Sequence, residues 1–85
     1  MESNEIIREE LFKVIQNQFK ANDPPETKIA FDRLTEQGYT EFQAMQLIGQ
    51  CLAIEVYGAL KNKNPYNHDR YVKNLNNLPK EPVEK

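Results

Sequence analysis

The sequence predicts an all-α single domain of four helices in which a long third helix is central. Apolar residues recur at three- and four-residue spacing through most of the chain, and Pro, Gly and Asn divide it into four such segments. The sequence contains no alternating strand pattern and no internal repeat. We therefore expect residues 1–79 to form the domain and residues 80–85, "KEPVEK", to form a flexible C-terminal tail.

The first helix is expected from Asn4 to Lys20. Acidic residues crowd its beginning and lysines its latter part, which suits the helix dipole. The residues on its predicted apolar stripe are Ile7, Leu11, Val14, Ile15 and Gln18, with Phe12 and Phe19 at the flank.

The stretch "NDPPETK", residues 22–28, predicts the start of a second helix. Asp23 is placed as the N-cap, Pro24 as the first helical residue, and Glu26 as the partner in a capping box. We expect this helix to run to about Gln37, with Gly38 as the left-handed residue that ends it. The residues expected to face inward are Ile29, Ala30, Phe31 and Leu34.

A second capping box, Thr40 with Gln43, opens the longest apolar segment, which runs from Phe42 to Leu60. Its apolar residues spread over about 240° of the helix surface, so several helices must pack around it. The small residues Gly49, Ala53 and Gly58 would permit close approach of those helices.

The fourth helix is expected after Pro65, which disfavours a helical conformation at the residue before it. Asn67 is the predicted N-cap and Pro79 ends the helix. Its predicted inner face is Tyr71, Val72, Leu75 and Leu78.

The composition is that of a folded domain, with 39% hydrophobic and 28% charged residues. The N-terminus resembles no signal peptide and no stretch is apolar enough to span a bilayer, so we expect a cytoplasmic protein. Cys51 is the only cysteine, and its place in an apolar run indicates a core residue and not a nucleophile.

Charge is unevenly distributed along the chain. Residues 1–55 carry a net charge of −5, residues 56–80 carry +4 and residues 81–85 carry −1. This asymmetry predicts a weak electrostatic dipole.

Two polar residues, Glu55 and Gln18, fall within apolar stripes, and we expect both to be buried. A buried carboxylate needs a partner or a proton. Arg33 is the preferred partner for Glu55, and Arg70 is the second choice. Glu55 could serve as a general acid or base, but we favour a buried ion pair that fixes helix register.

A second candidate surface combines tyrosines and basic residues, which together can stack on and neutralise single-stranded nucleic acid. However, lysines near a helix C-terminus also suit its dipole, and a pI near 5.4 is low for a nucleic-acid binder. We therefore expect nucleic-acid binding to be weak or absent. The residues of this surface are Tyr57, Lys61, Lys63, Tyr66, Arg70 and Lys73.

We expect no metal and no cofactor. His68 is the only histidine, and with one distant cysteine it forms no zinc-ligand pair. We expect its side chain to face solvent in the first turn of the fourth helix.

Residues 24–55 allow two further interpretations, both of which we disfavour. A helix-turn-helix would place Glu41 at the start of the recognition helix and no basic residue before Lys61, whereas groove readers need basic or amide side chains there. The same stretch resembles a ubiquitin-associated domain, but its last helix is about twice as long as in that module.

The segment from "NDPPETK" to "GAL" resembles a family of small, uncharacterised bacterial all-helical proteins, which share N-D-P-P-E, then R-L, a glycine and an A-x-x-x-I-G helix. The likeness extends over most of residues 14–79. It implies an all-helical fold and a bacterial origin but no activity. Some relatives read H-E-A-x-H where this chain has residues 42–46, "FQAMQ", so metal chemistry in those relatives would not carry over.

From these observations we expect a noncatalytic protein-protein interaction or assembly module, with a homodimer as one form. The alternatives are a small-ligand binder or enzyme centred on Glu55, and a weak nucleic-acid binder that uses residues 57–77.

Overall fold

The computed structural model describes residues 2–61, 63 and 65–83, with side chains from residue 8 onward. Its four helices are α1 (Glu2–Ala21), α2 (Pro25–Glu36), α3 (Glu41–Lys61) and α4 (His68–Asn77), and no strand occurs among these residues. The predicted all-α fold is thus confirmed.

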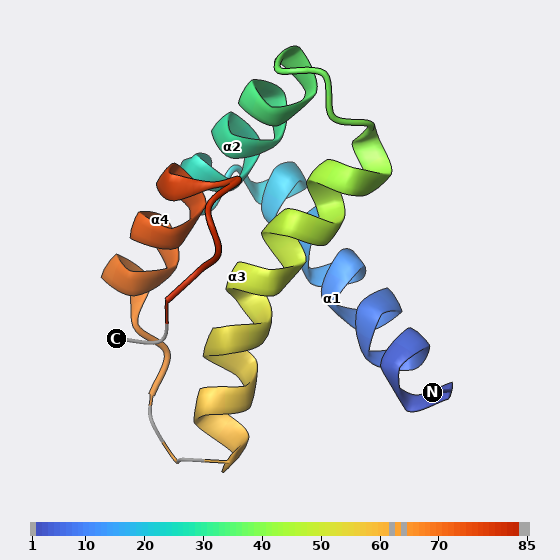
Figure 1. The fold of residues 1–85 in the computed structure, drawn as a ribbon. Coiled ribbons are helices and arrows are strands. Elements are labelled where there is room, and N and C mark those ends of the chain that lie inside the picture. The colour runs from blue at the N-terminus through green and yellow to red at the C-terminus, as the bar shows by residue number, and fades with distance from the viewer. Residues whose placement is uncertain (1, 62, 64, 84–85) are drawn as a thin grey trace.

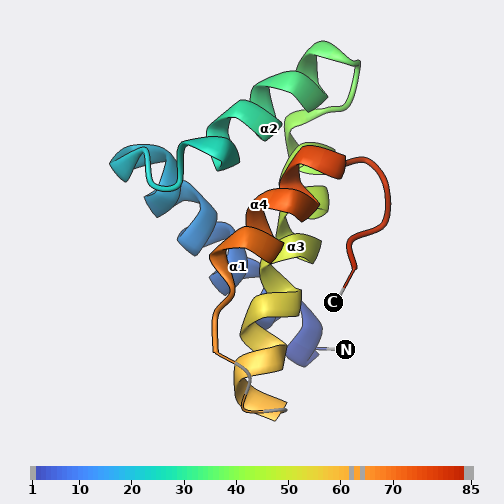
Figure 2. The same cartoon turned by 90° about the vertical axis from the view of Figure 1, so that its left-hand side faces the viewer.

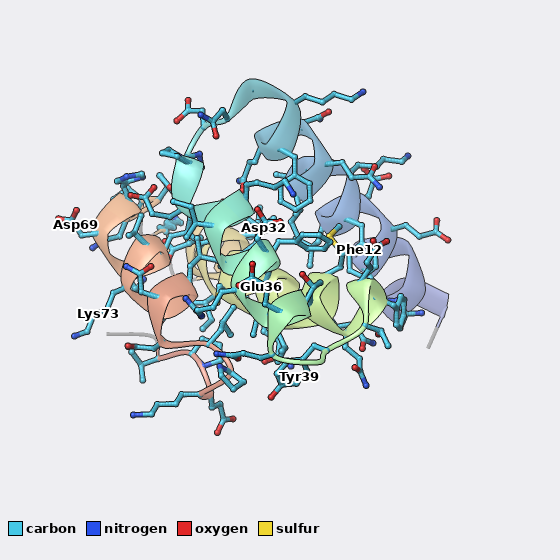
Figure 3. The ribbon with its side chains drawn as sticks, turned by 90° about the horizontal axis from the view of Figure 1, so that it is seen from above. Phe12, Asp32, Glu36, Tyr39, Asp69 and Lys73 are labelled. Atoms are coloured by element: carbon cyan, nitrogen blue, oxygen red, sulfur yellow. The ribbon has the colours of Figure 1, made fainter. Side chains whose placement is uncertain are left out.

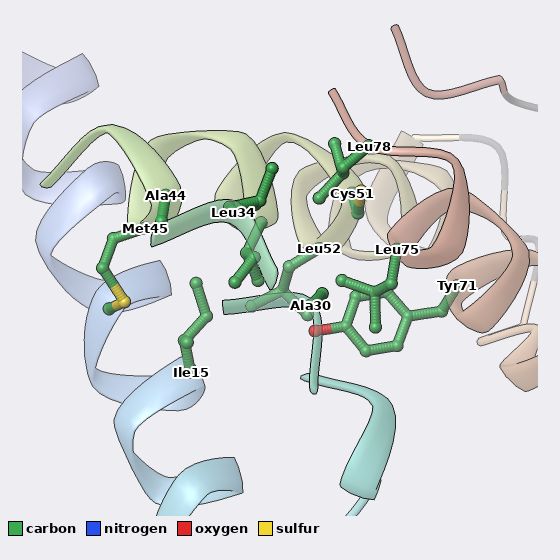
Figure 4. Close-up of a cluster of buried hydrophobic side chains, with 11 residues drawn as sticks. Ile15, Ala30, Leu34, Ala44, Met45, Cys51, Leu52, Tyr71, Leu75 and Leu78 are labelled. Atoms are coloured by element: carbon green, nitrogen blue, oxygen red, sulfur yellow. The ribbon is translucent and has the colours of Figure 1, made fainter. Parts of the chain in front are cut away.

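Helix α3 runs through the middle of the molecule and contacts all three other helices (Figure 1). Helix α2 also contacts α1 and α4, so it closes the bundle at one end, as the rotated view shows (Figure 2). The buried side chains come from all four helices and meet between them (Figure 4). The buried hydrophobic residues that make up this core are Ile15, Ala30, Leu34, Ala44, Met45, Ile48, Cys51, Leu52, Tyr71, Leu75 and Leu78.

The buried stripe of α1 differs from the prediction at one position. Ile15 is fully buried, and Phe12 and Phe19 pack partly against the core, whereas Val14 is exposed. Val14 lies 100° around the helix from Ile15, beyond the edge of the stripe that the two aromatic rings complete. The side chain of Ile7 lies outside the described residues.

Helix α2 begins one residue later than predicted. Pro24 occupies the N-cap position with extended backbone angles, Pro25 is the first helical residue, and the predicted Asp23 cap is wrong. A residue that precedes proline is disfavoured in the helical conformation, so Pro24 cannot begin the helix when Pro25 follows it. Ile29, which we expected inside, is 58% exposed.

The start of α3 is as predicted. Gly38 adopts a positive φ of 105°, and the capping box is formed by two hydrogen bonds. The Gln43 N–H donates to Thr40 Oγ1 at 3.1 Å, and the Thr40 N–H donates to Gln43 Oε1 at 2.9 Å. These bonds satisfy backbone groups that the first helical turn leaves without partners.

Helix α4 is capped by Asn67, whose side-chain oxygen accepts the Arg70 N–H at 2.9 Å, as predicted. Tyr71, Leu75 and Leu78 are buried, and Val72 is half-buried. After α4 the chain turns and runs back between α4 and α3, where the sequence predicts a flexible tail (Figure 1). Residues 84 and 85 lie outside the described residues.

Candidate functional site

Glu55 is buried in the C-terminal half of α3 and makes three hydrogen bonds. Its Oε2 accepts Arg70 Nε at 2.7 Å, and its Oε1 accepts Arg70 Nη2 at 2.8 Å and the Asn67 N–H at 2.9 Å. The carboxylate therefore joins α3 both to α4 and to the residue that caps α4. This bidentate geometry is the strongest form of an Arg-carboxylate pair.

The pKa of Glu55 reflects opposing effects. Burial alone would raise it, but the hydrogen bonds from Arg70 and Asn67 and the positive charge of Arg70 outweigh burial and lower it. Glu55 is thus ionised at neutral pH. A general acid would instead need a raised pKa.

Arg33, the preferred partner in the sequence analysis, does not pair with Glu55. Its Nη2 donates to the backbone carbonyls of Leu75 at 3.1 Å and Leu78 at 2.7 Å. Carbonyls at the end of a helix lack partners within the helix, so Arg33 caps the C-terminus of α4 from α2. The second choice, Arg70, is the correct partner of Glu55.

Gln18 takes part in a separate polar cluster. Its Oε1 accepts the Thr27 hydroxyl and the Tyr71 hydroxyl, each at 2.8 Å, so one amide oxygen joins α1, α2 and α4. Burial raises the pKa of Tyr71 to about 12, although the hydrogen bonds with Thr27 and Gln18 oppose this shift. Figure 4 shows the Tyr71 hydroxyl pointing inward beside Ala30.

The sequence analysis missed Thr27 and Asn74, which are both buried. A signal existed for each of them. Thr27 precedes Ala30 by three residues, and Asn74 lies at helical spacing from Tyr71 and Leu78, so both fall on apolar stripes.

Of the six tyrosine and basic residues, Tyr66 and Arg70 line one pocket, and Tyr57 and Lys61 lie together at the end of α3. Lys61 Nζ lies 5.8 Å from the Tyr57 ring centroid at the end of α3, and Tyr66 lies beside His68 and Tyr71. Arg70 is held by Glu55, and Lys63 is exposed in the loop. Lys73 projects outward from α4 (Figure 3).

The outward surface of α3 has an unusual composition. Glu55 is the only charged residue between Glu41 and Lys61, and it is buried. We call the outward residues the α3 outer face, and each of them is exposed or half-buried. They are Gln43, Gln46, Gln50, Ala53, Ile54 and Tyr57.

Two large exposed apolar side chains lie near the ends of α3, and a groove lies beside the α3 outer face. Phe42 is 53% exposed and Leu60 is 74% exposed, near opposite ends of α3. Between α1 and α3 lies a groove of about 260 Å³, whose α1 side is formed by Arg8, Leu11 and Phe12. In this groove the Phe12 ring would lie 3.8 Å from a Cβ placed on Gly49, which is an ordinary van der Waals distance.

Cys51 is fully buried, as predicted, and burial raises the pKa of its thiol to about 12. His68 is exposed in the first turn of α4, and its Nδ1 lies 3.0 Å from the Tyr66 hydroxyl. Across the part of the chain that the structure describes, no three His, Cys, Asp or Glu side chains gather as a metal site would require. Over the same residues, no helix is long and apolar enough to cross a membrane.

No family model, curated protein or solved structure matches this chain. The resemblance to a bacterial helical family therefore stays a prediction.

Proposed function

We propose that the chain is a noncatalytic, cytoplasmic assembly module that forms a homodimer through the α3 outer face. The observation that carries this proposal is the absence of exposed charge along α3 between Glu41 and Lys61, in a chain with 28% charged residues. The centres of protein interfaces are depleted of charged side chains, whereas the surface of a free helix normally carries them.

The chemistry of this face favours a second copy as the occupant. Gln46 and Gln50 carry amides, and an amide both donates and accepts hydrogen bonds, so the same residue can pair with itself across a twofold axis. No charged side chain is present to repel its own image. With 21 residues, α3 is about 31 Å long, which is sufficient for an interface of ordinary size.

The bulky and small residues of α3 also suit self-packing. Phe42 and Tyr57 lie near the two ends of the exposed surface, and the small residue Ala53 lies between them. Two antiparallel copies of α3 would place these aromatic side chains beyond Ala53 of the other copy, so their backbones could approach closely. We therefore expect α3 to pack on α3 of the second copy.

A catalytic role for Glu55 is less well supported. All three of its hydrogen bonds are made within the protein, and its lowered pKa keeps it ionised. The nucleic-acid alternative is weakened because Glu55 engages the Arg70 guanidinium, which would otherwise be available to a phosphate.

Analytical ultracentrifugation of the wild type and of Gln50→Glu tests the proposed dimer. We expect a wild-type dimer and an association constant reduced by roughly tenfold or more in Gln50→Glu, because two carboxylates would face each other near the axis. Asn17→Asp is the matched control, since it makes the same amide-to-carboxylate change at an exposed position of α1 and should leave the dimer intact.

A wild type that stays monomeric at every concentration would overturn the proposed function. A dimer that survives Gln50→Glu with unchanged affinity would place the interface elsewhere.

A further inference from the structure

Two large apolar side chains project from the same side of α3, near its opposite ends. Phe42 is 53% exposed and Leu60 is 74% exposed. Leu60 follows Phe42 by 18 residues, which is five full turns of 3.6 residues each, so the two side chains leave the helix in the same direction. They lie about 27 Å apart along the helix axis, so they cannot meet within one copy of the chain. Ala53 projects within about 20° of the same direction, so both side chains border the α3 outer face.

Helix α1 holds Phe42 in place while leaving it accessible. The Phe42 ring meets the Phe12 ring edge to face, with centroids 5.9 Å apart, and the Arg8 guanidinium lies 5.7 Å from the Phe42 centroid. A side chain that is already ordered loses little conformational entropy when a partner covers it. Phe42 is thus a preorganised apolar contact, and aromatic anchors of this kind carry much of the binding energy in protein interfaces.

The two ends of α3 carry opposite charges. Glu41 is its first residue and Lys61 its last, and no exposed charged residue lies between them. A second copy packed antiparallel brings its Lys61 level with Glu41 of the first copy and opposes the two helix dipoles, and both arrangements are electrostatically favourable. A parallel copy would instead bring like charges level with each other. The charge distribution therefore favours an antiparallel second copy as the partner of this surface.

Symmetry then selects one register. A twofold axis that reverses α3 keeps each side chain on the same edge of the interface, so residues on one edge at equal distances from the axis meet across it. We propose that the axis lies at the level of Cys51, midway between Phe42 and Leu60, and that Phe42 of each copy packs on Leu60 of the other. This pairing rests on the proposed homodimer and adds its orientation, its register and the two side chains that set them.

Disulfide trapping tests the orientation and the register together. Phe42→Cys and Leu60→Cys proteins, one of them carrying a mass tag, are mixed, oxidised and separated on a non-reducing gel. We expect the mixture to form a linked heterodimer at least tenfold faster than either variant forms a linked homodimer. Bridged cysteines need Cα atoms within about 7 Å, whereas two copies of one of these positions would be about 27 Å apart. The mixed dimer keeps one native Phe42–Leu60 contact at its other end.

A matched control separates this contact from random collision. Ala59→Cys places a thiol at an exposed position at nearly the height of Leu60 but 100° around the helix, so its mixture with Phe42→Cys should remain unlinked. The wild type, oxidised in the same way, reports on Cys51, which is fully buried and should form no cross-link.

Alanine substitutions test the same contact without cysteine chemistry. Phe42→Ala and Leu60→Ala should each lower the dimer association constant at least tenfold in sedimentation experiments. Because both changes remove one shared contact, the double variant should be no weaker than the more severe single variant, whereas independent sites would multiply their effects. Ile29→Ala shortens an exposed apolar side chain on α2 and should leave the association constant unchanged.

These measurements distinguish failure of the register from failure of the dimer. A wild type that sediments as a monomer overturns the proposed function, and the register with it. A wild-type dimer overturns the register alone if Phe42→Cys cross-links to itself, as a parallel pair requires, if its mixture with Leu60→Cys links no faster than its mixture with Ala59→Cys, or if the two alanine effects multiply.

Discussion

The Gln18 side-chain oxygen organises three helices at once. It accepts hydroxyl hydrogen bonds from Thr27 and Tyr71, and both donors are fully buried. A buried hydroxyl without a partner is unfavourable by about 1–3 kcal/mol, so this cluster stabilises the bundle chiefly by leaving no donor unpaired. These hydrogen bonds also fix the position of α1 along its axis relative to α2 and α4.

Replacement of Tyr71 by Phe should lower the free energy of unfolding by about 1 kcal/mol. The ring and its packing remain, while Gln18 Oε1 loses one of its two donors. Urea unfolding followed by circular dichroism measures the change. Tyr66→Phe is the control, because that ring is exposed, and its effect should stay within about 0.5 kcal/mol. Equal effects of the two changes would show that the buried Tyr71 hydroxyl stabilises the fold no more than the Tyr66 hydroxyl, which lies beside His68.

Sequence reasoning placed Glu55 correctly in the core, but Gln18, which we also expected to be buried, is half-buried, and the preferred partner of Glu55 was wrong. Glu55 and Gln18 fall on apolar stripes, and stripe position depends only on local helical geometry. The choice between Arg33 and Arg70 depends on where α2 and α4 lie relative to α3, which no local pattern contains. Arg33 donates to the Leu75 and Leu78 carbonyls at the end of α4, and these carbonyls come within its reach only when α2 packs beside α4.

At the scale of helices, the start of α3 was predicted correctly because a capping box marks it in the sequence. The start of α2 was predicted one residue too early. Thr40 and Gln43 satisfy each other within four residues, so sequence alone specifies that cap. In "DPPE" either proline could be the first helical residue. Pro25 is that residue, because a residue that precedes proline favours an extended conformation, and Pro24 therefore lies outside the helix. The position of the C-terminal segment was likewise not predictable from local sequence, because the Asn74 side chain hydrogen-bonds to the backbone of Val83, nine residues later in the chain.

Two glycines should respond oppositely to alanine. Gly58 is within α3 and a Cβ there would meet nothing within 4 Å, so Gly58→Ala should raise the free energy of unfolding by about 0.5–1 kcal/mol. Gly38 also has open space around it but has a φ of 105°, so Gly38→Ala should lower that free energy by about 1 kcal/mol or more. Urea unfolding of both variants tests the pair, and shifts of the same sign would contradict the conformational argument.

For the whole molecule, α3 has two distinct surfaces. Its inner side carries the core and Glu55, which joins it to α4, while its outer side carries no exposed charge from residue 42 to residue 60. Packing against α1, α2 and α4 therefore accounts for the inner side only. The proposed dimer uses the remainder.

The Glu55–Arg70 pair makes the stability of the whole fold depend on pH. The folded state lowers the pKa of Glu55 below its ordinary value of 4.5, so the unfolded chain takes up the proton first. The stabilisation that ionised Glu55 contributes is fully present above about pH 5, and it is lost as the pH falls through the pKa of Glu55 in the folded state. Loss of one partner from a buried pair is unfavourable by about 3–5 kcal/mol, so Glu55→Gln should be less stable than the wild type at pH 7 by roughly that amount.

Thermal unfolding of the wild type and Glu55→Gln between pH 7 and pH 3 measures this effect. The stability difference between the two proteins should be constant from pH 7 to about pH 5 and should shrink as the pH is lowered further. The comparison cancels the titration of the other carboxylates, which both proteins share. A difference that stays constant down to pH 3, or that widens on acidification, would mean that Glu55 is not stabilised in its ionised form by Arg70 and Asn67.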